Sequence, residues 1–158
     1  MPRAVNAAFI ALGVALPFAA NAADADACNF LTSAQVSAAV GLTVGEGTHV
    51  TPTFVKTCTW TPGDKSKVAA VTLNLQTAAV YDGGKRNAAM GTAISGKDVG
   101  MKPASVGDDA YYLTTAGQVQ LFVKKGDSSF KVVVYAKIPA ADKEAMEMKL
   151  AKAVAGKL

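Results

Sequence analysis

Few side chains in this sequence have the chemistry of a catalytic or metal-binding group. His49 is the only histidine, so one chain cannot form a histidine metal cluster or a Ser-His-Asp or Cys-His catalytic set. We interpret His49 as a loop residue whose hydrogen bonds are satisfied locally. Asp108 and Asp109 open a predicted strand, where successive side chains point to opposite faces. We therefore expect them to serve a turn or a strand entry rather than a pair of catalytic carboxylates.

Four methionines could supply the soft sulfur ligands that Cu(I) prefers. Met146 and Met148 lie two residues apart in a predicted helix and therefore point in different directions, while Met90 and Met101 are distant from them in the chain. We interpret the methionines as core-filling or surface residues, and the sequence predicts no metal or other cofactor. The enzymatic alternative is a hydrolase-type site built from Asp, Glu, Lys and Tyr side chains alone.

The first residues predict export. Arg3 is followed by an apolar run over residues 7–20 and by Ala20-Asn21-Ala22, which is the pattern of a secretory signal peptide. The apolar run is shorter than the roughly 20 residues that a membrane-spanning helix needs. We expect residues 1–22 to be a signal peptide and residues 23–158 to be a single periplasmic or secreted domain.

The cysteine count and the net charge further limit the class of protein to which this chain can belong. Two cysteines, Cys28 and Cys58, remain after the predicted cleavage, and an even number in an exported chain favours a structural disulfide. The formal net charge is +4, from 16 basic and 12 acidic residues. The lysines are spread along the chain, which is not the clustered footprint of a nucleic-acid-binding protein. We expect the partner to be an unknown protein or small ligand of the cell envelope.

Local signals predict where helices and strands form. Thr32 and Gln35 have the spacing of a capping box, and Gly41 can end the helix that they begin. Val119, Leu121 and Val123 alternate with other residues at the period of a strand. The further expected elements are strands over 56–61 and 71–76, a helix over 78–90, a long loop over 91–106, a three-stranded meander over 107–135 and a helix from near Pro139.

These elements predict an α+β domain of order α-β-β-β-α-β-β-β-α. The expected architecture is an antiparallel sheet of about five or six strands with helices mainly on one face. The alternative is a three-layer α/β/α sandwich.

Three short motifs carry a resemblance to a known group of proteins. They are the helix start Cys28-x-Phe30-Leu31-Thr32, the strand Cys58-Thr59-Trp60 and the hairpin entry Gly107-Asp108-x-Ala110-Tyr111. Together with a lysine-rich hairpin they resemble a broad group of exported bacterial domains of unknown function, many of them small lipoproteins. The resemblance covers nearly all of the mature chain, but it carries no catalytic residues. Unlike the lipoprotein members, this chain has Asp24 and Asp26 where a lipobox would require small residues before the cysteine.

The sequence therefore predicts an exported, non-catalytic binding or interaction module. Loops as long as residues 91–106 are uncommon in compact domains and are often binding elements. We expect a partner to contact this loop, Met101, and the neighbouring aromatic residues Tyr111 and Tyr112. The alternative is a plain connector over a fully covered core.

Overall fold

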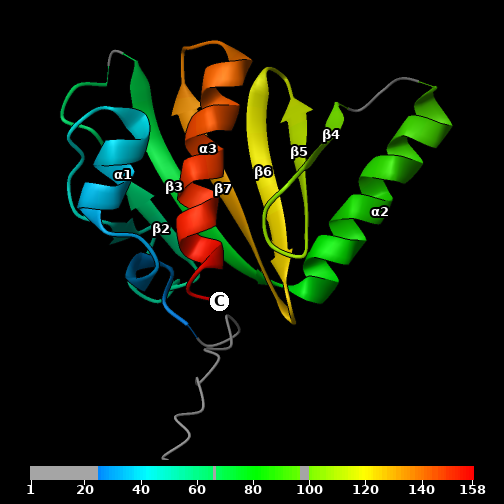
Figure 1. Ribbon diagram of the computed structural model, residues 1–158, viewed down its shortest axis with the longest axis horizontal. Coiled ribbons are helices and arrows are strands. Elements are labelled where there is room, and N and C mark those ends of the chain that lie inside the picture. Colours follow the sequence, from blue (N-terminus) through cyan, green and yellow to red (C-terminus); the bar gives the residue numbers. More distant parts are fainter. Residues whose placement is uncertain (1–24, 66, 97–99) are drawn as a thin grey trace, which may run out of the picture.

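The computed structural model describes residues 25–65, 67–96 and 100–158, which form one antiparallel sheet flanked by helices (Figure 1). The signal peptide predicted for residues 1–22 lies outside the described residues. In chain order the elements are a 3-10 helix Ala27–Asn29, α1 Ser33–Val40, β1 Thr48–His49, β2 Thr57–Trp60, β3 Val68–Thr77, α2 Ala78–Ser95, β4 Met101–Ala104, β5 Asp109–Thr115, β6 Gln118–Lys125, β7 Ser128–Ala136 and α3 Ala140–Ala155.

The local signals around α1 are confirmed. The hydroxyl of Thr32 accepts a hydrogen bond from the backbone N–H of Gln35 at 3.2 Å, and the side chain of Gln35 accepts one from the N–H of Thr32 at 2.9 Å. This reciprocal pair satisfies two of the donors that a helix start leaves open. Gly41 ends the helix in the left-handed region at φ 70°, where a residue without Cβ meets no steric penalty.

The sheet has seven strands in the order β1-β2-β3-β7-β6-β5-β4, so the expected five or six is slightly too few. The meander expected over 107–135 is confirmed as β5, β6 and β7. The additional strand is β4, which pairs with β5 from Met101↔Leu113 to Ala104↔Ala110. Pro103 is tolerated there because β4 is an edge strand and needs no second set of ladder bonds.

The predicted loop over 91–106 is wrong at both ends. Helix α2 does not stop at Met90 but continues to Ser95, where Gly96 caps it in the left-handed region at φ 64°. Residues 101–104 form β4. Helical hydrogen bonds and edge-strand pairing therefore satisfy backbone groups of residues that were predicted to form a loop. Residues 97–99 lie outside the described part of the chain.

The helices lie on both faces of the sheet. Tyr111 and Tyr112 are successive residues of β5 and therefore point to opposite faces. The ring of Tyr111 contacts Tyr81 of α2, whereas the hydroxyl of Tyr112 donates to the carbonyl of Glu144 on α3. Helices α1 and α3 lie side by side over one face, in front of the sheet in Figure 1. The expected one-sided arrangement holds for these two helices, and α2 covers part of the other face.

The core lies between the sheet and the pair α1 and α3. Trp60, Leu73, Leu121 and Leu150 are each at most 1% exposed within it. The predicted disulfide is confirmed: Cys28 is bonded to Cys58 with a Cα–Cα distance of 5.0 Å, which joins the 3-10 helix to β2. Across the described ranges, no helix is both long enough and apolar enough to cross a membrane.

Candidate functional site

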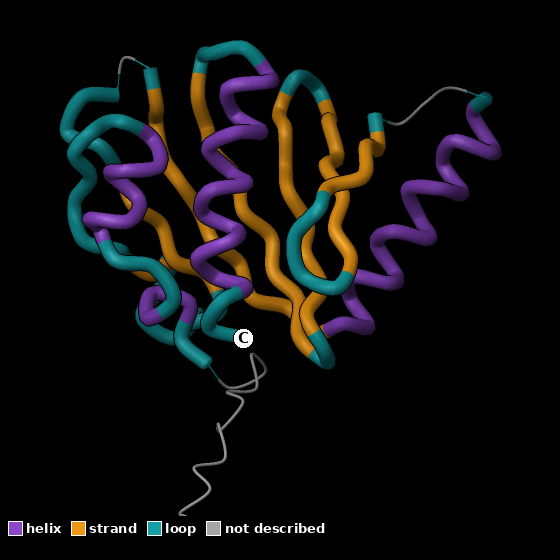
Figure 2. Tube along the Cα trace, in the orientation of Figure 1, coloured by secondary structure: helices purple, strands orange, loops and turns teal. Residues whose placement is uncertain are grey.

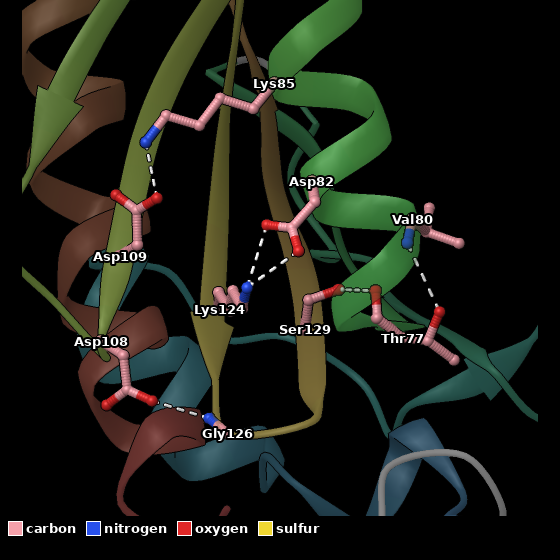
Figure 3. A network of polar contacts seen from close by, with 9 residues as sticks. All are labelled: Thr77, Val80, Asp82, Lys85, Asp108, Asp109, Lys124, Gly126 and Ser129. Atoms are coloured by element: carbon pink, nitrogen blue, oxygen red, sulfur yellow. Dashed lines mark hydrogen bonds and ion pairs between the residues drawn. The ribbon is translucent and has the colours of Figure 1, made fainter.

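The first turns of α2 are fastened to the sheet (Figure 3). The side chain of Thr77 caps the helix by accepting from the N–H of Val80 at 3.4 Å. The carbonyl of the same threonine accepts a 2.7 Å hydrogen bond from the hydroxyl of Ser129 on β7. The N–H of Ala78 donates to the carbonyl of Asp127 in the turn between β6 and β7. These bonds set where the helix leaves the sheet.

Two ion pairs extend this attachment along the helix. Lys124 of β6 binds both carboxylate oxygens of Asp82 at 3.0 and 2.9 Å. Lys85 reaches Asp109 of β5 at 2.5 Å, and this hydrogen bond is the main cause that lowers the pKa of the Asp109 carboxyl. The four side chains are between 28% and 44% exposed. Pairs this accessible to solvent stabilise by under about 1 kcal/mol each, so they orient α2 more than they stabilise the fold.

The two adjacent aspartates serve different partners, as the alternation of a strand predicts. Asp109 binds Lys85, while Asp108 accepts a 2.7 Å hydrogen bond from the N–H of Gly126 in the hairpin turn between β6 and β7. They do not form a carboxylate pair.

Three aromatic rings form the floor beneath the first turns of α2. Tyr111 stacks on Phe122 with ring centroids 5.0 Å apart and an interplanar angle of 9°. Tyr81 packs on Tyr111 at 5.2 Å in a tilted arrangement. Burial, followed by the nearby carboxylate of Asp109, raises the pKa of the Tyr81 hydroxyl. A raised pKa disfavours the phenolate, so Tyr81 is poorly suited to act as a base or nucleophile near neutral pH.

A groove of about 640 Å³ lies between α2 and the far end of β5. Its lining consists mostly of small and uncharged residues: Gly84, Asn87, Ala88, Gly100, Leu113, Thr114, Thr115 and Ala116. Gly84 allows helix and sheet to approach here, because a Cβ at this position would lie 3.3 Å from the hydroxyl oxygen of Tyr111. The groove offers shape and apolar contact rather than charge.

The outer half of α2, residues 87–95, begins at this groove, which Asn87 and Ala88 line, and continues beyond it. Every side chain from Asn87 to Ser95 is exposed or half-buried. Met90 is 56% exposed and Ile94 is 80% exposed. In Figures 1 and 2 this end of the helix extends away from the strands, whereas its first turns lie beside β6 and β7. Within the described residues, the helix is thus anchored at one end and exposed at the other.

The three residues predicted to contact a partner are not brought together on one surface. Tyr111 and Tyr112 are only 2% and 5% exposed, and they face opposite layers. Met101 is half-buried, and its pairing with Leu113 places it on the face that α2 covers in part. Partner contact by these residues stays a prediction.

The exposed surface near Met101, Tyr111 and Tyr112 is formed by other residues, those of the outer half of α2 and of the groove. The signal was present in Met90 and Ile94, two large apolar residues spaced one helical turn apart. It was missed because the helix was expected to end at Met90.

Among the described residues, Asp26, Cys28 and His49 bring their side chains close together. The ring of His49 binds the carboxylate of Asp26 at 2.8 Å, and this hydrogen bond is the main cause that lowers the pKa of Asp26. The sulfur of Cys28 lies near both, but it belongs to the disulfide and is not a thiolate ligand.

The methionines lie on different layers. Met146 and Met148 of α3 pack against the core, while Met90 lies on the exposed part of α2. Together with Met101 on β4, they are distributed over both faces of the sheet and do not converge on one point. The interpretation as core-filling and surface residues therefore fits their positions.

Comparison with known proteins finds no relative of this chain. No family model, no curated protein and no solved structure matches this chain.

Proposed function

We propose that this chain is an exported, non-catalytic binding module whose partner packs against the outer half of α2 and the groove beside it. The observation that carries the proposal is the contrast along α2. Its first turns are held by a cap, two ion pairs and an aromatic floor, while its outer half leaves Met90 and Ile94 exposed beside a groove of about 640 Å³.

The energetics of the helix support a partner. In proteins, most helical stability comes from packing an apolar face rather than from intrinsic propensity. Gly83, Gly84 and Gly91 lie inside α2, and each costs about 1 kcal/mol relative to alanine. The outer half receives little packing from the described part of the chain to offset that cost. Burying Met90 and Ile94 against a partner would contribute up to about 1.5–3 kcal/mol for each side chain that is fully covered.

The character of the groove indicates what the partner presents. Among the described residues, its lining carries no ionisable side chain, and the charged groups under the first turns of α2 are already paired with each other. Methionine is enriched at protein interfaces because its flexible side chain adapts to the opposing surface. We therefore expect a partner that inserts apolar groups, such as a protein segment with exposed apolar side chains.

The same arrangement favours binding over catalysis. A hydrolase-type site would need an available acid, base or nucleophile beside the groove. Lys85 and Asp109 bind each other, and the raised pKa of Tyr81 opposes its ionisation. An ion pair and an un-ionised tyrosine support packing and orientation of α2 rather than proton transfer.

Hydrogen exchange on the intact protein tests the proposed surface. On addition of envelope extract, amides of residues 87–95 should gain protection. The double variant Met90→Ser/Ile94→Ser should lose that gain. A matched control, Val50→Ser/Phe54→Ser, removes two apolar side chains that are 67% and 49% exposed in a different segment, and it should keep the gain. Equal protection in both variants, or none in the unaltered protein, would refute the proposed surface.

Export is tested separately. N-terminal sequencing of the protein recovered from outside the cytoplasm should begin at Ala23. Recovery of exported protein that still begins at Met1 would contradict the assignment of residues 1–22 as a cleaved signal peptide.

A further inference from the structure

A second recess forms where β6 and β7 separate. Their ladder runs from Lys125↔Ser128 to Leu121↔Val132, while β7 continues beside β3 as far as the pair Val68↔Ala136. Beyond the ladder, side chains take over the backbone groups of Val134. Its N–H donates to Glu147 at 2.9 Å, and its carbonyl accepts from Gln118 at 3.2 Å. The side chains of Glu147 and Gln118 therefore replace β6 as the hydrogen-bond partners of Val134 where the two strands separate.

The recess has a volume of about 200 Å³ and lies where β3 begins and β7 ends. Both strand ends are at the top of Figure 1. It is lined by Lys65, Lys67, Ala69, Gln118, Tyr135, Ala136 and Lys137. The segments before β3 and after β7 are tied together here, because the N–H of Lys137 donates to the carbonyl of Lys67 at 3.0 Å. That bond places the two lysines on the same rim.

The charged side chains that line this recess are all lysines. Within residues 25–65, 67–96 and 100–158, none of the ammonium groups of Lys65, Lys67 and Lys137 lies within ion-pair distance of a carboxylate. Asp64 precedes the first of these lysines but lines a different hollow. Gln118 already donates to two backbone carbonyls. Among the described side chains that line the recess, the donors without a partner are thus the three lysines and the hydroxyl of Tyr135, which is 43% exposed.

We propose that this recess binds the phosphate group of a small ester. Lysine ammonium groups bind phosphate as compact point charges, and several of them around a concave surface focus a positive potential into it. An oxyanion would neutralise the like charges of the lysines and accept a hydrogen bond from Tyr135. The site is separate from the groove beside α2 and does not depend on the proposed function.

Titration of the full mature chain with inorganic phosphate, followed by amide NMR at constant ionic strength, tests this site. Saturable changes in amide chemical shift are expected at Lys65, Lys67, Tyr135 and Lys137. Two further arms use glycerol phosphate and vesicles of phosphatidylglycerol, which separate a free phosphate ester from a lipid headgroup. Binding of the soluble ester supports the proposal, whereas binding to vesicles alone overturns the assignment to a small ester.

A matched pair of variants separates this site from general attraction. Lys67→Gln/Lys137→Gln removes two charges from the rim, and affinity should fall by about tenfold or more because charge-assisted contacts are lost. Lys149→Gln/Lys152→Gln removes the same charge from exposed positions on α3, and affinity should change by less than about twofold, as for surface charges at a distance. No saturable shift, or equal losses in both variants, would overturn the site.

Discussion

Glu147→Gln should remove a strong pH dependence from the folding stability. Glu147 lies on α3 and is completely buried, with one carboxyl oxygen accepting from the N–H of Val134. Its other oxygen has no hydrogen-bond partner among the described residues. Burial raises the pKa of this carboxyl to about 8, although the Val134 hydrogen bond and the charge of Lys143 oppose the shift and Glu144 adds to it. An acid with a raised pKa keeps its proton in the folded state.

The direction of the effect follows from proton linkage. In the unfolded chain the carboxyl has its ordinary pKa of 4.5, and in the folded protein the pKa is about 8. Between these values the folded state binds more protons than the unfolded state, so stability falls as pH rises. The difference of about 3.5 units, at about 1.4 kcal/mol per unit, sets an upper limit near 5 kcal/mol. Stability should be highest below about pH 4.5 with respect to this group and should stop falling above about pH 8.

Urea unfolding at a series of pH values measures this dependence. Glutamine has nearly the same shape and can still accept from Val134, but it does not titrate. Glu147→Gln should therefore lose the downward slope and exceed the unaltered protein in stability near pH 8. Glu144→Gln removes a carboxyl from the same helix at a position where the side chain is 22% exposed. It should keep most of the slope, because Glu144 is only a minor cause of the raised pKa of Glu147. Parallel profiles for Glu147→Gln and the unaltered protein would refute the reasoning.

Two further predictions concern the disulfide and the glycine pair of α2. Removing the Cys28–Cys58 bond, by reduction or by Cys28→Ser/Cys58→Ser, should lower the free energy of unfolding by about 3–4 kcal/mol for a separation of 30 residues; a loss under about 1 kcal/mol in urea unfolding would contradict this. Gly83→Ala should stabilise by about 0.5–1 kcal/mol through helix propensity, since its Cβ meets no atom within 4 Å. Gly84→Ala should gain less, because its Cβ would crowd Tyr111, and equal gains in thermal unfolding would count against close packing at that position.

Features that depend on a few neighbouring residues could be predicted from the sequence. Thr32 and Gln35 specify a capping box through spacing alone, and Gly117 and Gly126 mark hairpin turns that adopt positive φ values of 77° and 56°. The period-2 pattern of the meander likewise needs no distant information. Pairing of the two cysteines followed from their even number and the predicted compartment.

The placement of α2 and the surfaces that result depend on contacts between elements that lie apart in the sequence. Tyr111 and Tyr112 are both buried and aromatic, so their pattern does not show which helix each one meets. The end of α2 was misjudged because a glycine at 91 lowers helix propensity without forbidding the helix. Convergence of the lysines depends on the pairing of β3 with β7, which brings Lys67 to Lys137. Burial of Glu147 depends on the packing of α3 against the sheet at Val134. Both contacts join different elements of the fold, and local propensity carries no information about them.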